Sequence, residues 1–256
     1  MSKADSSNYK SKKKYFLKKG ANRRTLDVNL KGFLCSCNSR EKDCIKESYN
    51  LLNEYADKLY PAVLNPSDNE TDEQDISESL SKEISGLKGT GPSSERRFQV
   101  IESGAKNFLF IRTSLENPAE LAEAIIKDIH DSGSQKTRFL LRLIPVEITC
   151  RATPDEIGKA FLKISEKHFK DSPQTFCVIF NHRNNNVVSR DEIIKLIADK
   201  VNETRSDHKV NLKGAKLSII VEVIKGFAFL SVVPDYLKYK KYNLLSVCSQ
   251  EVSSDK

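Results

Sequence analysis

A loop rich in arginine and asparagine joins two apolar segments in the second half of the chain. Within "NHRNNNVVSRD" (181–191), Arg183, Asn184, Asn185 and Arg190 lie between a strand-like run and a helical run. Guanidinium groups, asparagine amides and the free N–H groups of a helix N-terminus can all bind a phosphate or an unpaired base. We therefore predict that this loop binds RNA, although a plain solvated turn has the same composition.

Other basic side chains could extend this surface. The full set of predicted RNA-binding residues is Arg151, Lys159, Lys163, Arg183, Asn184, Asn185, Arg190, Lys225 and Lys241.

Positive charge is concentrated at the N-terminus. Residues 1–24 hold nine Lys or Arg and one Asp, so they carry more than the whole formal net charge of +7. A basic tail attracts nucleic acid by releasing counterions from it. The alternative is a tail that serves only for solubility or nuclear targeting.

Motifs for catalysis and for cofactors are missing from the sequence. It contains no G-x-x-x-x-G-K-[ST], no G-x-G-x-x-G after a strand, no G-x-S-x-G and no pair of His at helical spacing. The adjacent acids Asp155–Glu156 and Asp191–Glu192 begin predicted helices, where they favour the helix dipole. We expect no catalytic residue, no bound cofactor and no enzymatic activity.

The cysteines leave two possibilities open. Cys35, Cys37 and Cys44 form C-x-C-x6-C, which offers three thiolates but lacks the C-x2-C spacing and the fourth ligand of a structural zinc site. Packing as small apolar side chains is the alternative, and we predict no metal.

The first half of the chain has the element order of a ferredoxin-like domain. Alternating and helical patterns predict a strand at 30–37, a helix ending at Pro61, strands at 96–101 and 107–113, a helix after Asn117 and a strand at 138–150. This order is the βαββαβ pattern.

The second half is predicted to read helix, strand, helix, strand, strand. Thr153 with Glu156, and Ser189 with Glu192, match the capping box that begins a helix. Two long apolar strands joined at Lys225–Gly226 form a hairpin.

These patterns predict an α+β protein with two domains. We expect a disordered basic tail at 1–29, a ferredoxin-like domain at 30–146 with a disordered acidic insertion at 65–95, a second domain at 147–247, and a flexible C-terminus at 248–256. We found no membrane span and no secretory signal. We expect the nucleus, and within it the nucleolus, with the cytoplasm as the alternative.

Five segments carry a resemblance to a known family. They are "GFLCSCNSREKDCIKESYNLLNEYADKLYP" (32–61), "RFLLRLIPVEITCRAT" (138–153), "FNHRNNNVVSRDEII" (180–194), "VNLKGAKLSIIVEVIKGFAFLSVVPDY" (210–236) and "KYNLLSV" (241–247). The chain resembles the THUMP-domain proteins of tRNA modification, and among them the non-catalytic adaptors of tRNA acetylation.

The resemblance implies a ferredoxin-like domain followed by a THUMP domain at 147–247, which together recognise the tRNA acceptor end with its single-stranded CCA. It also implies a partner, a separate RNA acetyltransferase that supplies acetyl-CoA and forms 4-acetylcytidine in the D-arm of serine and leucine tRNAs. On this hypothesis the chain positions the RNA. The open alternative is a general RNA-binding or scaffold protein of the nucleolus, independent of acetylation.

Overall fold

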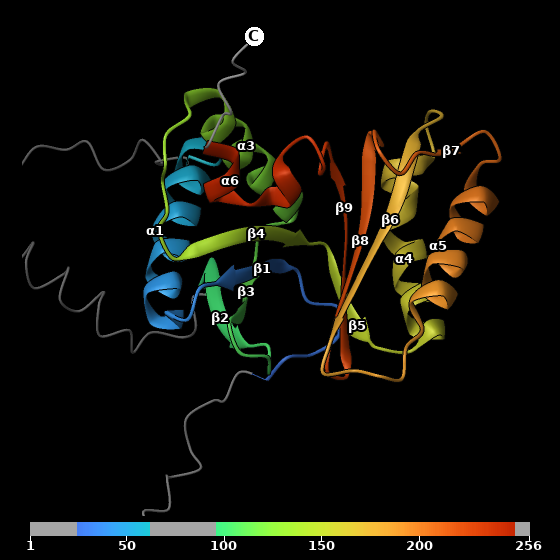
Figure 1. Cartoon of the computed structure of the whole chain (residues 1–256), viewed down its shortest axis with the longest axis horizontal. Helices are drawn as coiled ribbons and strands as arrows, with labels where there is room; N and C mark the ends of the chain where they lie inside the picture. Colours follow the sequence, from blue (N-terminus) through green and yellow to red (C-terminus); the bar gives the residue numbers. More distant parts are fainter. Residues whose placement is uncertain (1–24, 62–95, 249–256) are drawn as a thin grey trace, which may run out of the picture.

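A computed structural model describes residues 25–61 and 96–248 of the chain. The predicted acidic insertion, residues 1–24 of the predicted basic tail and residues 249–256 of the predicted flexible C-terminus lie outside the described residues. Within the described part the chain forms two sheets with helices packed on them (Figure 1). The predicted α+β class is confirmed.

The first sheet has the predicted ferredoxin-like topology. Its elements are β1 (Gly32–Cys37), α1 (Glu41–Leu59), β2 (Phe98–Glu102), β3 (Phe108–Thr113), α3 (Pro118–Ser132) and β4 (Leu140–Val146). The strand order is β2-β3-β1-β4 and all neighbouring strands are antiparallel. Both helices bury an apolar stripe, as the helical spacing of their apolar residues requires.

The second sheet contains both parallel and antiparallel neighbours. Its elements are β5 (Ile148–Arg151), α4 (Pro154–Phe169), β6 (Thr175–Arg183), α5 (Arg190–Thr204), β7 (Lys209–Val210), β8 (Leu217–Ile224) and β9 (Phe227–Pro234). The strand order is β5-β9-β8-β6-β7, with β6 parallel to both β7 and β8. No helix of the described residues is long and apolar enough to cross a membrane.

The central strands of the second sheet are buried on both faces. Ile219 and Val221 of β8 pack with α4 and α5 in one core, whereas Ile220 and Ile224 belong to the core of the first sheet. Alternation along a strand explains this division, since successive side chains point to opposite faces. The two sheets therefore share a packed boundary.

The chain passes from one sheet to the other at Glu147, where a single predicted strand divides into β4 and β5. The Glu147 N–H donates to the Leu230 carbonyl (2.9 Å), and its carboxylate accepts from the Val232 N–H (2.9 Å). Nε2 of His168, at the end of α4, lies 3.0 Å from the same carboxylate. These contacts fix the direction in which β5 leaves the first sheet.

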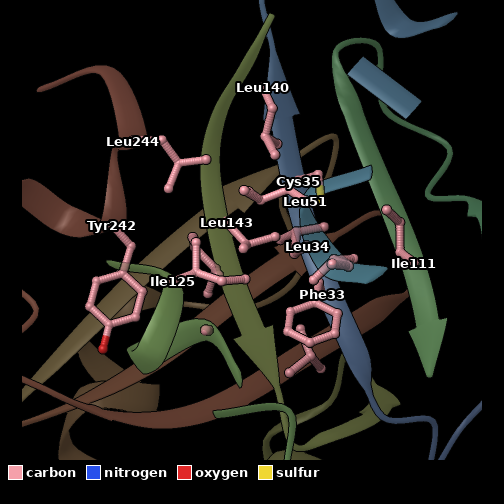
Figure 2. Packing of buried hydrophobic residues seen from close by; sticks show 14 of the residues in the cluster. Phe33, Leu34, Cys35, Leu51, Ile111, Ile125, Leu140, Leu143, Tyr242 and Leu244 are labelled. Atoms are coloured by element: carbon pink, nitrogen blue, oxygen red, sulfur yellow. The ribbon is translucent and has the colours of Figure 1, made fainter. Parts of the chain in front are cut away.

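Residues after β9 pack on the first sheet, although their place in the sequence predicts that they belong to the second. They form a short 3-10 helix, η1 (Lys240–Tyr242), and α6 (Leu244–Cys248). Tyr242 and Leu244 lie in one core with Ile125 of α3 and Leu140 of β4, as Figure 2 shows. The C-terminal boundary predicted from sequence therefore cuts through a packed segment, because apolar spacing alone does not say which core a helix will join.

The end of the predicted tail is also held in place. The Asn29 N–H donates to the Thr149 carbonyl (2.7 Å), and the Thr149 hydroxyl donates to the Asp27 carbonyl (2.7 Å). Residues 25–29 thus line up beside β5 instead of belonging to a disordered tail.

The three clustered cysteines lie in the core of the first sheet. Cys35, Cys37 and Cys44 are buried, and the Ser48 hydroxyl is 3.7 Å from the Cys35 sulfur. Burial raises the pKa of Cys35 to about 12 and also raises the pKa of Cys44. Within 25–61 and 96–248 no three His, Cys, Asp or Glu side chains are grouped to hold a metal.

Candidate nucleic-acid interface

Most of the predicted RNA-binding residues meet at one end of the second sheet. β6 ends at Arg183 opposite Ile224 of β8, and the Ala152 N–H, just after β5, donates to the Gly226 carbonyl (3.0 Å). The loop 184–189 then leads into α5, so this end also contains the N-termini of α4 and α5 (Figure 1). We call it the basic edge and define it by Arg151, Arg183, Arg190, Lys225 and the loop 184–189.

The four cations of the basic edge are exposed and have no ion-pair partner among the described residues. Arg151, Arg183, Arg190 and Lys225 all lie on the surface. None of them forms an ion pair with any residue that the structure describes. Asp155, Glu156, Asp191 and Glu192 occupy the first turns of α4 and α5, so carboxylates flank this basic cluster.

Aromatic rings hold two of these guanidinium groups. The guanidinium carbon of Arg183 lies 4.0 Å from the ring centroid of Phe108, which belongs to β3 of the first sheet. The guanidinium carbon of Arg151 lies 4.5 Å from the ring centroid of Phe227. A cation stacked on a ring face loses side-chain freedom and keeps its N–H groups available at the rim of the plane. Both arginines are therefore oriented before any ligand arrives.

Lys225 also connects the basic edge to the first sheet. It occupies the β8–β9 turn in the left-handed region, with φ of 52°. A methyl group added at Gly104, in the β2–β3 turn, would lie 3.1 Å from Cδ and Nζ of Lys225. The absence of a side chain at Gly104 thus lets the lysine stem lie against the first sheet.

Asn184 and Asn185, at the start of the loop 184–189, differ in role. Oδ1 of Asn185 accepts hydrogen bonds from the N–H groups of Val187 (3.0 Å) and Val188 (3.1 Å), while Nδ2 donates to the Lys225 carbonyl (2.7 Å). The Asn185 side chain therefore holds the loop together and has little capacity left for RNA. Asn184 is exposed and has φ of 52°, a conformation that asparagine tolerates better than most residues.

One predicted capping box at this site is wrong and the other is half formed. Ser189 precedes α5 but its side chain makes no capping hydrogen bond. The Thr153 hydroxyl does accept from the Glu156 N–H (3.4 Å), but the Glu156 carboxylate turns to Lys159 (2.9 Å) instead of reaching back. The N-terminal N–H groups of α5 thus have no side-chain cap from Ser189.

Lys159, Lys163 and Lys241 are not among the residues that define the basic edge. The hydrogen bond from Lys159 to Glu156 raises the pKa of Lys159, and Nζ of Lys163 donates to Oδ1 of Asn29 (3.2 Å). Lys241 follows the far end of β9, whose eight residues span about 23 Å at the usual rise of a strand. Lys241 is therefore the least suited of the nine to act with the others.

A cleft opens beside the basic edge, between the two sheets. It has a volume of about 710 Å³, and both sheets and the segment before β1 contribute to it. Its lining combines apolar side chains with two carboxylates and one lysine: Thr25, Leu26, Glu41, Ile45, Val100, Glu102, Ser103, Leu109, Ile224, Lys225, Gly226 and Phe227. Since Thr25 and Leu26 line the cleft, residues 1–24 join the described part of the chain at this place.

A buried carboxylate lies behind the basic edge, and sequence reasoning missed it. Glu222 is 3% exposed and faces the boundary with the first sheet, where Nδ2 of Asn181 donates to its Oε1 (2.6 Å). Burial raises the pKa of Glu222, while the hydrogen bond and the charges of Arg183 and Arg142 act in the opposite direction. Its Oε2 has no hydrogen-bond partner among the described residues. A lone acid in the apolar run "LSIIVEVI" was the available signal.

Known proteins are similar to this chain in sequence. The THUMP domain family model matches residues 151–233, which include the whole basic edge. A Drosophila melanogaster protein, "THUMP domain-containing protein 1 homolog", is 40% identical over 262 residues, covering 93% of this chain and 79% of the relative. The chain belongs to the THUMP domain-containing protein 1 family.

Two further matches extend the comparison. The Saccharomyces cerevisiae protein named "tRNA acetyltransferase TAN1" is 28% identical over 274 residues, covering 97% of this chain and 93% of the relative. The solution structure of the THUMP domain of THUMP domain-containing protein 1 is 36% identical, covers 30% of this chain and 87% of that chain, and has a TM-score of 0.26. The family model confirms the predicted THUMP domain over residues 151–233.

Proposed function

We propose that this chain binds tRNA through the basic edge and presents it to a separate RNA cytidine acetyltransferase. One observation carries the proposal: exposed cations from two strands, one helix and the β8–β9 turn converge at one end of the second sheet without ion-pair partners among the described residues. Unpaired surface cations at the N-termini of two helices form a site for phosphate, since the helix dipoles add to their charge.

Several features favour RNA over a small anion. The guanidinium planes of Arg151 and Arg183 are held on aromatic rings, so they can fork two hydrogen bonds to a phosphate or stack on an unpaired base. The cleft beside them has apolar walls and two carboxylates, which suit a splayed nucleotide with an exocyclic amine. Residues 1–24, which precede Thr25 in the sequence, contain nine basic residues that add attraction for the RNA backbone.

The finer proposal concerns the reaction that the bound RNA undergoes. The tRNA would be gripped at its acceptor end, including the single-stranded CCA, and 4-acetylcytidine would form in the D-arm of serine and leucine tRNAs. The name of the yeast relative supports tRNA acetylation as the reaction. We propose that the partner enzyme carries the active site and the acetyl-CoA, because the sequence contains no motif for binding the cofactor's phosphates.

On this proposal the chain positions the tRNA near the active site of the partner enzyme and catalyses no step itself. A tRNA held at one end presents its D-arm to the partner at a high effective concentration, which converts an encounter of two solutes into an event within one complex. We propose that this takes place in the nucleus, and within it in the nucleolus. A general RNA-binding or scaffold role in the nucleolus is the competing proposal.

Reconstitution from purified components tests this division of labour. The chain, the acetyltransferase and a serine or leucine tRNA would be combined singly and together with acetyl-CoA, and 4-acetylcytidine measured by mass spectrometry. We expect acetylation only when enzyme and chain are both present, and far less with tRNAs of other amino acids. Acetylation by the chain alone would refute the non-catalytic role. Acetylation by the enzyme alone at the full rate would favour the scaffold role.

A further inference from the structure

We infer that the outer edge of the second sheet is the surface that docks the acetyltransferase, through an extended segment of that enzyme with apolar and acidic side chains. The inference rests on the proposed function. The surface comprises residues 209–216, which we call the edge segment; it contains β7 and the turn that leads into β8.

Two large aliphatic side chains of the edge segment are unusually exposed. Val210 is 60% exposed and Leu212 is 73% exposed, and they lie two positions apart in the sequence. Among the described residues, Val187 on the basic edge is the one large apolar side chain with higher exposure, at 85%. Single exposed aliphatic residues are common on protein surfaces, but two in one structured segment provide an anchor for a partner.

The backbone of β7 offers an open strand edge. The N–H groups of Lys209 and Asn211 donate to the carbonyls of Gln174 (3.0 Å) and Phe176 (2.8 Å) beside β6. Because hydrogen-bonding groups alternate along a strand, the N–H and carbonyl of Val210 point away from β6. β7 is the last strand in the sheet order, so no described strand satisfies these groups. An extended peptide can add to such an edge.

The edge segment is held in one conformation. Oδ1 of Asn211 accepts from the N–H groups of Lys213 (3.1 Å) and Gly214 (2.9 Å), and the Lys216 N–H donates to the Thr175 hydroxyl (3.1 Å). Before it, His208 is buried and its Nε2 lies 3.0 Å from the Phe169 carbonyl. A preorganised surface loses little conformational entropy on binding.

Charge and chemistry indicate a polypeptide as the occupant. Lys209, Lys213 and Lys216 are exposed around the two aliphatic side chains, and none of them forms an ion pair within the described part of the chain. These cations select acidic side chains. RNA would also meet the charge, but it stacks on aromatic and guanidinium planes, and neither is present in this segment. Aliphatic anchors and open backbone groups fit a strand of protein.

The position of the edge segment suits an adaptor. β7 pairs with Thr175 and Phe176 at the start of β6, whereas Arg183 lies at its end. The nine residues of β6 span about 26 Å at the usual rise of a strand. Figure 1 accordingly shows β7 at the opposite end of the second sheet from the turn between β8 and β9. An enzyme docked on the edge segment would leave the basic edge free for tRNA.

The test is a titration of the full chain with the purified acetyltransferase, alongside a titration with tRNA. The variant Val210→Ser/Leu212→Ser should bind the enzyme at least about 10-fold more weakly, since anchor residues in an interface contribute more than their neighbours. Its affinity for tRNA should change less than about twofold, because distant sites act independently. The matched control, Leu59→Ser/Leu162→Ser, removes aliphatic side chains that are 39% and 41% exposed elsewhere and should bind the enzyme normally.

A second variant, Lys209→Glu/Lys213→Glu, leaves the aliphatic pair intact and should also weaken enzyme binding. The affinity that remains should depend less on salt concentration than that of the unmodified chain. The inference is overturned if the unmodified chain binds the enzyme and both edge-segment variants bind it equally well. It is also overturned if they lose tRNA affinity in place of enzyme affinity, because the surface would then bind RNA. Failure of the unmodified chain to bind the enzyme at all would instead refute the proposed function on which the inference rests.

Discussion

Replacing Arg183 and Arg190 together with alanine should weaken tRNA binding sharply while leaving the fold intact. Both guanidinium groups are exposed and neither has an acidic partner among the described residues, so each is free to bind a phosphate or a base. Removal of a charge-assisted hydrogen bond costs about 1–3 kcal/mol. Two such removals predict an affinity at least about 10-fold lower.

The structure also predicts what the same change does to stability. Arg183 stacks on Phe108 across the boundary of the two sheets, and removing this cation–π interaction should lower the free energy of unfolding by about 0.5–1 kcal/mol. Arg190 lies exposed in the first turn of α5 and should contribute almost nothing. The buried stripe of Ile193, Ile197 and Val201 is unchanged, so the helix should remain folded.

Binding would be measured by titration of fluorescent tRNA with and without its CCA end. If the basic edge grips the CCA, trimming it should weaken the unmodified chain but weaken the Arg183→Ala/Arg190→Ala variant little further, since both changes remove one interaction. The matched control is Lys238→Ala/Lys241→Ala, which removes two exposed lysines from the segment that follows the opposite end of β9 and should change affinity little. Fully additive losses would show that the basic edge does not bind the CCA end. An equal loss in the control would show that general surface charge, and not the basic edge, binds the RNA.

Three other perturbations have defined outcomes. Asn185→Ala should lower the free energy of unfolding by about 2 kcal/mol, because it removes three hydrogen bonds in the loop, whereas Asn186→Ala should leave a chemical denaturation curve unchanged. The raised pKa of Glu222 means that the native state binds a proton more tightly than the unfolded state, so the free energy of unfolding should fall as pH rises from the ordinary carboxyl pKa to the raised one. Glu222→Gln should flatten this fall. An unchanged pH profile of stability in the variant would contradict the prediction. Deletion of residues 1–24 should weaken tRNA binding and reduce the slope of log affinity against log salt by about 0.7–0.9 for each phosphate that the tail neutralises. An unchanged slope together with failed nuclear import would show that the tail serves only as a targeting signal.

The fold of the first sheet could be predicted from sequence because its signals are local. The short apolar run in 30–37 and the helical spacing around Leu52 and Ile125 each indicate one element, and the order of the elements matches a single common topology. The packing of Tyr242 and Leu244 on the first sheet could not be predicted in this way. Their spacing indicates that both side chains are buried, but it does not indicate which of the two cores they join.

The composition of the candidate site was only partly readable from sequence. Cations concentrated near strand ends and helix starts indicated the basic edge, because those positions meet at one end of a sheet with parallel strands. Phe108 and Gly104, which orient Arg183 and Lys225, come from the first sheet, far away in sequence, and no local pattern pairs them with the loop. Asn185 shows another limit of sequence reasoning: its residue type predicts that it binds a ligand, but no local pattern predicts the three hydrogen bonds by which its side chain holds the loop together.

The central claim is that the basic edge delivers tRNA for acetylation, and one measurement in cells tests it most directly. Serine and leucine tRNAs would be purified from cells that lack the gene, and from the same cells expressing either the unmodified chain or Arg183→Ala/Arg190→Ala at equal levels. 4-Acetylcytidine would be measured by mass spectrometry. We predict that the modification is lost on deletion, is restored by the unmodified chain, and is restored poorly by the variant. Normal 4-acetylcytidine in the deleted cells, or full restoration by the variant, would contradict the claim.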